Sequence, residues 1–172
     1  MIKNLVKILI YFVLFVPIQV LIMDNIHLFR FVTPFLYLYI IVKIPVNVTR
    51  SQVIIISFLL GIVIDIFSNT LGMHAAACSL AGMFRNPLMN TFSGKELAEN
   101  ATPSYHTLGV SAFMKYVFFL VLFHHVTLFS IESLSLFDPV FLFIRIFANV
   151  IATVLFIFIV EAFNIERRRV ES

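Results

Sequence analysis

The fold of this chain is decided by the stretch Gly61-Ile-Val-Ile-Asp65-Ile-Phe-Ser68-Asn-Thr-Leu-Gly72-Met-His74-Ala-Ala-Ala-Cys78-Ser-Leu-Ala-Gly82-Met-Phe-Arg85. Polar groups, glycines and other small residues gather here inside an otherwise apolar sequence. An apolar helix ends within the stretch, a tight turn carries the polar groups, and a second helix rich in small residues begins. The sequence therefore predicts a helical hairpin that could be a catalytic site, a ligand site or an assembly surface.

The composition excludes a soluble globular domain. Of 172 residues, 61% are hydrophobic and 12% are charged, whereas soluble domains carry about 25% charged residues. The apolar runs are continuous over roughly 12 to 25 residues, which is typical of membrane helices and not of the shorter alternating strands of a barrel. The predicted fold class is all-α, a polytopic membrane protein with one integral membrane domain over residues 1–172.

Charge and cysteine content exclude further classes. The net charge is only +3, and the basic residues lie at the ends of apolar runs, so nucleic acid is not a predicted partner. Cys78 is the single cysteine, so the chain forms no intramolecular disulfide and no cysteine-based metal cluster.

A bundle of six transmembrane helices is predicted, at about residues 5–23, 26–44, 53–68, 71–85, 106–129 and 139–163. The second helix is the weakest, because Thr33-Pro34 has the pattern of a helix start and Pro45 ends the run. Its core of about 11 residues is roughly 17 Å long, short of a hydrocarbon layer of about 30 Å. It crosses the membrane only if it begins near Ile26 and kinks at Pro34.

The basic residues predict the orientation. With six spans and a cytoplasmic N-terminus, the C-terminus is also cytoplasmic, and the outer loops hold only Arg30. The inner side then holds Lys3, Lys7, Lys43, Arg50, Arg85, Lys95 and the arginines at 167–169. No small-residue cleavage site follows the first run, which favours a retained span over a signal peptide. Residues 86–107 form the long polar connection, either an ordinary loop or a docking segment.

Four ionisable residues fall inside the predicted spans, where an unpaired charge is costly. Counted along the helices, Asp65 and Arg145 lie toward the outer boundary, whereas Lys115 and Glu161 lie toward the inner one. Depth therefore predicts two ion pairs, Asp65 with Arg145 and Lys115 with Glu161. The alternative for the second pair is that both side chains extend to the membrane surface.

The hairpin has the pattern of a helix–helix contact. Gly61, Asp65 and Ser68 share one helical face, and the spacings Ala77-xxx-Ala81 and Cys78-xxx-Gly82 allow close approach of two backbones. A side chain at position 68, 69 or 70 could cap the fourth predicted helix, at 71–85. The candidate structural or interface residues are Gly61, Asp65, Ser68, Gly72, His74, Cys78, Gly82, Arg85, Lys115, Arg145 and Glu161.

Catalytic and metal sites are not predicted. His74 lies in the first turn of the fourth predicted helix, at 71–85. It is interpreted as a structural residue that bonds a turn carbonyl, and the alternative is a proton relay or a metal ligand. His124 and His125 are adjacent and project about 100° apart, a poor arrangement for metal ligands. The sequence has no nucleophile motif, zinc signature or phosphate loop, and an aspartyl protease needs a second carboxylate beside Asp65. No cofactor is predicted.

The pattern Gly61-xxx-Asp65-xx-Ser68-xxx-Gly72-x-His74-Ala75, ending in Phe84-Arg85, resembles the signature hairpin of the MreD family. MreD is the small membrane subunit of the bacterial rod-shape, or elongasome, system. The length, six spans, cytoplasmic termini and short basic tail agree. The resemblance implies a non-enzymatic protein of the bacterial inner membrane that binds the scaffold protein MreC. The resemblance also implies indirect coupling to the machinery of peptidoglycan elongation, namely the actin-like MreB, RodA and the transpeptidase partner of RodA.

A second function follows from the same resemblance, because the family is similar in fold to the substrate-binding subunits of energy-coupling-factor vitamin transporters. Such a subunit needs aromatic and hydrogen-bonding groups that converge from the outer loops. The predicted outer loops are short, there is no tryptophan, and the small residues are confined to the fourth helix. These points favour the scaffold function. Which helix binds the partner, and whether the chain forms a homodimer, are left open.

Overall fold

The computed structural model describes residues 2–23, 32–94, 97–98, 101–134 and 138–170. This part of the chain is all-helical, as predicted. Its helices are α1 (Ile2–Leu21), α2 (Leu38–Val42), α3 (Arg50–Ser68), α4 (Met73–Ser93), α5 (Tyr105–Leu108), α6 (Val110–Glu132) and α7 (Pro139–Val170).

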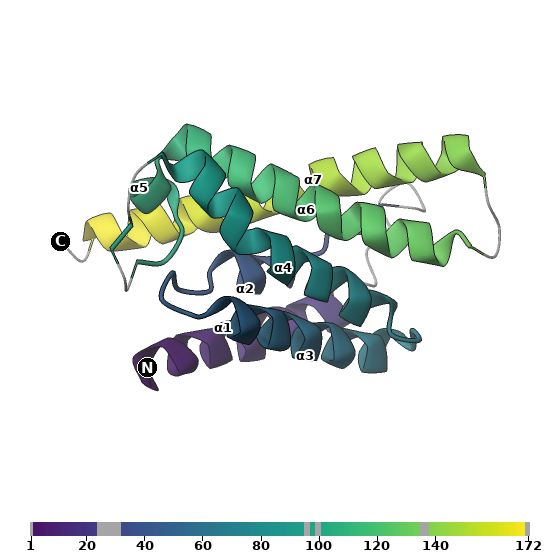
Figure 1. Ribbon diagram of the computed structural model, residues 1–172, viewed down its shortest axis with the longest axis horizontal. Helices are drawn as coiled ribbons and strands as arrows, with labels where there is room; N and C mark the ends of the chain where they lie inside the picture. Colours follow the sequence, from purple (N-terminus) through teal and green to yellow (C-terminus); the bar gives the residue numbers. More distant parts are fainter. Residues whose placement is uncertain (1, 24–31, 95–96, 99–100, 135–137, 171–172) are drawn as a thin grey trace.

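The helices form an elongated bundle in which the chain reverses at both ends (Figure 1). One end holds the turn between α3 and α4, together with the end of α6 and the start of α7; it is called the turn end below. The opposite end, called the terminal end, holds the start of α1 and the end of α7. The described chain therefore begins and finishes at the same end of the bundle.

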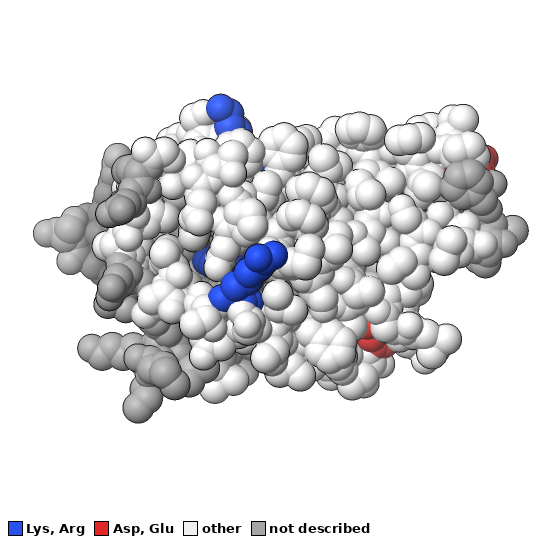
Figure 2. Space-filling model, viewed as in Figure 1, with Lys and Arg blue, Asp and Glu red and all other residues white. Residues whose placement is uncertain are grey.

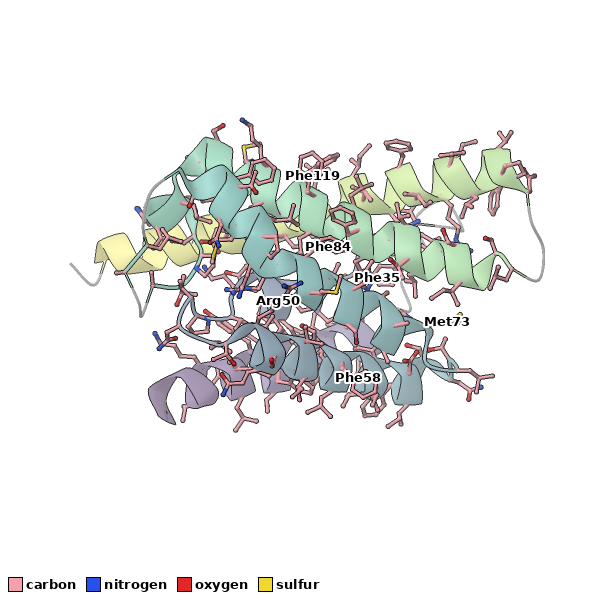
Figure 3. All side chains as sticks on the ribbon, in the orientation of Figure 1. Phe35, Arg50, Phe58, Met73, Phe84 and Phe119 are labelled. Atoms are coloured by element: carbon pink, nitrogen blue, oxygen red, sulfur yellow. The ribbon has the colours of Figure 1, made fainter. Side chains whose placement is uncertain are left out.

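Among the described residues, three helices are long and apolar enough to cross a membrane: α3, α6 and the part of α7 from Pro139 to Phe163. Their outward faces are apolar, as at Phe58 of α3, which is 46% exposed and points away from the bundle in Figure 3. The face drawn in Figure 2 carries few charged groups. Continuous apolar faces of this extent are favourable where lipid replaces water, so these helices suggest a multi-pass membrane protein.

Capping groups set the bounds of α3 and α4. The α3 helix begins at Arg50, three residues before the predicted start, because Thr49 and Gln52 form a capping box. The α4 helix continues to Ser93, whereas the sequence predicted its end at about residue 85. Pro87 lies inside it, and the helix ends where Gly94 takes up the left-handed conformation, with φ of +59°. Gly94 thus ends α4, and the polar residues between 85 and 94 extend this helix of the hairpin.

The predicted helix over 106–129 is divided in two. The cap of the first part is Ser104, whose side chain accepts from the Thr107 N–H. The short helix α5 then ends at Gly109, where φ of +83° breaks the helix before α6 begins. Such a φ is strained for residues with a side chain.

The predicted second transmembrane helix is wrong over its described part, and residues 26–31 lie outside the described residues. Residues 32–37 are not helical, and α2 has five residues. From Leu36 to Val42 the side chains are at most 4% exposed. The segment contacts Asn149 at its start and Glu161 near its end, positions that lie about 18 Å apart along α7 at 1.5 Å per residue. Residues 32–44, called the central segment below, therefore run through the centre of the bundle.

Polar side chains of the surrounding helices satisfy the backbone N–H groups of this non-helical stretch. The N–H of Thr33 donates to Asn149 Oδ1 (2.8 Å), that of Phe35 to Thr153 Oγ1 (3.0 Å), and that of Leu36 to Gln19 Oε1 (2.7 Å). Pro34 has no N–H. Non-helical backbone is tolerated at membrane depth only where the protein supplies such partners, so these isolated polar residues of α1 and α7 have a structural role.

The carbonyl groups at the far end of the segment are satisfied in the same way. The Tyr116 hydroxyl donates to the carbonyl of Val42 (3.3 Å), and the Arg85 guanidinium donates to the carbonyl of Ile44. Arg85 is fully buried and also donates to Asn86 Oδ1 (2.6 Å). A cation beside the last carbonyls of a helix is favourable, so Arg85 holds the C-terminal end of α2 in the core.

Candidate functional site

Asp65 caps the helix that follows it. One oxygen of its carboxylate accepts from the backbone N–H of His74 (3.0 Å), and the other accepts from that of Ala75 (2.9 Å). The Thr70 hydroxyl also donates to Asp65. The residue before α4 is Gly72, which offers no side-chain cap, so the predicted cap from position 68, 69 or 70 is wrong. A carboxylate at a helix N-terminus satisfies otherwise unpaired donors and complements the helix dipole.

The small residues of the hairpin let α3 and α4 pack in close contact, as predicted. A Cβ atom added at Gly61 would lie 2.4 Å from the Cα atom of Ala75 and 2.5 Å from the carbonyl oxygen of His74. At Gly82 it would lie 2.5 Å from Ser57 Oγ. Gly61, which is one turn before Asp65, thus brings the backbone of α4 within reach of the carboxylate.

Tyr37 joins two histidines in the core. Its hydroxyl lies 2.8 Å from His74 Nδ1 and 3.0 Å from His124 Nε2, and all three side chains are buried. The interpretation of His74 as the partner of a turn carbonyl is therefore wrong for Nδ1. His124 Nδ1 has no partner among the described residues. A lone pair is less costly to leave unpaired than an N–H, so the network favours a proton on His124 Nε2 that is donated to Tyr37, and a Tyr37 proton donated to His74.

His125 belongs to a second chain of hydrogen bonds. Its Nδ1 lies 2.8 Å from the Val121 carbonyl, which can only accept, so Nδ1 carries the proton. Its Nε2 lies 3.2 Å from the Thr153 hydroxyl oxygen. That hydroxyl in turn accepts from the Phe35 N–H. His124 thus binds the central segment through Tyr37, and His125 is linked to it through Thr153.

Asp65 and Arg145 do not form the predicted ion pair. The carboxylate is occupied by the α4 N-terminus, and the Arg145 guanidinium lies 2.9 Å from Glu132 Oε1 and 4.5 Å from the centre of the Phe129 ring. Arg145 is 29% exposed and Glu132 38%. A pair this accessible contributes little to stability.

Lys115 and Glu161 do not pair either. Glu161 is 2% exposed and lies 3.0 Å from Lys43 Nζ, which is 6% exposed. Tyr39 donates to the same carboxylate (2.6 Å), and Lys43 also donates to the carbonyl of Pro103 (2.8 Å). Lys115 lies exposed on α6, whereas Glu161 is buried, so the alternative in which both side chains extend to the membrane surface is wrong for Glu161. The buried pair therefore joins the central segment to α7 and to the connection before α5.

A cavity of about 480 Å³ opens at the turn end, beside this polar core. Aromatic groups from several elements line it, among them Phe35, Phe67 and Phe129. Hydrogen-bonding groups of Thr33, Ser68, Thr70, His74, Glu132 and Arg145 also line it. The hairpin and the α6–α7 end thus bring together the kinds of groups that the sequence analysis found lacking in the outer loops. The combination of apolar walls and a few polar groups is typical of a small-molecule site.

The remaining candidate residues have structural positions. Cys78 is fully buried in the α3–α4 contact region, Ser68 is the last residue of α3 and Gly72 has φ of +77° in the turn. The sequence analysis missed the residues that organise the core. These are Gln19, Tyr37, Tyr39, Lys43, Tyr116, Asn149 and Thr153. The available signal was an isolated polar group inside an apolar run, which in a membrane is normally paired.

Replacing Asp65 by alanine is expected to lower the free energy of unfolding by about 3 kcal/mol, since two buried N–H groups lose their acceptor at about 1–3 kcal/mol each. Asp65→Asn keeps one acceptor oxygen and is expected to lose about half as much. Cys78 supplies the measurement, because a maleimide modifies this single buried thiol only when the hairpin opens. The Arg145→Gln variant should label like the wild type; equal acceleration in Arg145→Gln and Asp65→Ala would support the ion pair instead.

Comparison of the chain with protein-family models, with curated proteins and with solved structures finds no match.

Proposed function

We propose that this chain is a non-enzymatic membrane subunit of a bacterial cell-shape complex of the MreD kind. In this function it binds a bitopic scaffold protein of the MreC kind in the inner membrane. It is thereby coupled to the machinery of peptidoglycan elongation, which consists of the actin-like MreB, RodA and the transpeptidase partner of RodA.

The proposal rests on one observation: the polar residues of the hairpin make contacts within the protein. Asp65 binds the N-terminus of α4, and His74 binds Tyr37. Gly61 and Gly82 allow the two helices to touch. The residues behind the resemblance to MreD thus maintain one rigid arrangement of helices, as a subunit that presents a surface to partners requires. The apolar faces of α1, α3 and α7 remain exposed for lipid or for a partner helix.

The proposal includes six membrane crossings with both termini in the cytoplasm. Three helices have the length and hydropathy of membrane spans, and α1, the central segment and α4 supply the other crossings. In this arrangement the central segment crosses within the protein and not against lipid, which removes the need for a span-length helix. The common position of the two chain ends in Figure 1 agrees with an even number of crossings.

Depletion of the protein in a rod-shaped host is expected to produce round cells, with shape restored by the wild-type gene. A tagged copy is expected to purify with a bitopic scaffold protein. Because Cys78 is buried, cross-linking needs new cysteines on the exposed faces, for example at Val13 of α1 or Leu59 of α3, in a Cys78→Ala background. Normal rods after complete depletion would contradict the proposal.

The cavity at the turn end supports a second candidate, the binding of a small vitamin as in an energy-coupling-factor transporter. Its volume of about 480 Å³ and its mixed lining suit a molecule of that size. Protein purified from its host would then release a vitamin on denaturation. A bound vitamin without a co-purified scaffold protein would favour this function, and the converse result would favour the first.

A further inference from the structure

Lys115 lies between two hollows on the surface of the bundle. The first, of about 270 Å³, runs between α6 and α7 and is lined, apart from Lys115, by apolar side chains such as Phe118, Val154 and Phe158. The second, of about 460 Å³, lies where α4 ends and α6 begins. Its lining includes Thr91, Ser111 and again Lys115. One cationic side chain therefore stands where an apolar groove meets a more polar hollow.

The depths of the two hollows along the bundle differ. Lys115 is five residues from the start of α6, about 8 Å along its axis. The polar hollow extends from Lys115 toward the start of α6, at the terminal end, and the apolar groove extends from Lys115 toward the middle of the helix. This is the order in which a membrane phospholipid places its headgroup and its acyl chains.

The charge of Lys115 has no counterpart in the described protein. Lys115 makes no hydrogen bond or ion pair with any described residue. Of the described carboxylates, Asp65, Glu132 and Asp138 lie at the turn end, and Glu161 is buried against Lys43. A lysine in an apolar helix is costly unless its ammonium group reaches an anionic partner or water. The phosphate of a lipid headgroup supplies such a partner at this depth.

We propose that the two hollows and Lys115 form a binding site for one anionic phospholipid. The ammonium group binds the phosphate, the hydroxyl groups of Thr91 and Ser111 face the headgroup, and an acyl chain lies in the groove between α6 and α7. Phe119, labelled in Figure 3, stacks on Phe92 with ring centres 5.5 Å apart, so the border between the hollows has an aromatic wall. The site does not depend on the function proposed above.

The test counts lipids bound to the purified full-length chain by native mass spectrometry, in a neutral detergent with added phosphatidylglycerol or phosphatidylcholine. The wild type is expected to retain one phosphatidylglycerol with at least a ten-fold preference over phosphatidylcholine. Lys115→Gln is expected to weaken that binding about ten-fold. Arg50→Gln is the matched control, because Arg50 is an exposed cation at the same end of the bundle, and it should change binding less than two-fold.

Two further experiments distinguish a bound lipid from a bound free phosphate. Val154→Trp fills the apolar groove and leaves Lys115 in place, so it is expected to reduce phosphatidylglycerol binding at least five-fold. Millimolar inorganic phosphate should not displace the lipid. The proposal is overturned if Lys115→Gln binds like the wild type, if both cation variants lose binding equally, or if phosphatidylcholine binds as well. Displacement by phosphate, or full binding by Val154→Trp, would also overturn it. Unchanged protection of Cys78 verifies that each variant is folded.

Discussion

Replacing Lys43 by methionine is expected to lower the free energy of unfolding by about 3–5 kcal/mol, because it leaves the buried Glu161 carboxylate without its cation. Tyr39 would remain as a donor to the carboxylate, and the Pro103 carbonyl would lose its bond to the ammonium group. Since 1.4 kcal/mol corresponds to a factor of ten, Cys78 should react with a maleimide at least about a hundred times faster.

Two variants control for this result. The double variant Lys43→Met/Glu161→Leu removes both charges and should recover most of the lost stability, because a buried ion pair can often be replaced by apolar residues of similar volume. Lys115→Met makes the same substitution at an exposed site and should leave the labelling rate nearly unchanged. A Lys43→Met rate within three-fold of the wild type would mean that the pair does not hold the core together.

The second large effect is expected from Gly61→Ala. The new methyl group would lie 2.4 Å from the Cα atom of Ala75, so the helices must separate. Overpacking of this kind costs about 1–3 kcal/mol and sometimes more; we expect the upper end, because the obstructing atoms are backbone. The separation also moves the α4 N–H groups away from Asp65. Faster labelling of Cys78 and a lower temperature of unfolding in detergent would measure the effect.

Gly82→Ala provides a matched comparison on the same hairpin. Here the added methyl group meets the side chain of Ser57, at 2.5 Å from Oγ and 2.9 Å from Cβ. Removing that side chain in Ser57→Gly/Gly82→Ala should therefore restore much of the stability. Gly61→Ala should not be rescued by Ala75→Gly, because the clash is with the backbone of residue 75. Rescue in that variant would show that backbone contact is not what requires glycine at position 61.

The sequence predicted those features that depend on one helix or on neighbouring residues. The continuous apolar runs gave the all-helical class and the approximate positions of α1, α3, α6 and α7. The small residues at 61 and 82 predicted the close contact of α3 with α4. The pattern Asp138-Pro139 is typical of a helix start, and the Asp138 carboxylate accepts from the Phe141 N–H at 3.1 Å. In each case the spacing along one helix carries the information.

The predicted ion pairs were wrong because they were based on depth in the membrane alone. Two charges at the same depth can still lie on different sides of the bundle. Arg145 lies at the same end of the bundle as Asp65, but Asp65 has closer partners in the turn that follows it. Glu161 was predicted to pair with Lys115. Its actual partner, Lys43, was assigned to the end of the predicted helix at 26–44 and was therefore not considered as a buried charge. The direction of each side chain around its helix axis decides which charges meet, and that direction is set by packing.

By itself, the sequence determined that the chain is helical and apolar, that a polar hairpin interrupts it at residues 61–85, and that its small residues form a helix contact. Only the tertiary structure decided the role of the hairpin's charge and the path of residues 33–44. The physical reason is that a backbone group or a charge buried among apolar helices needs a partner. For Asp65 that partner is the start of α4, and for the central segment the partners come from α1, α4, α6 and α7.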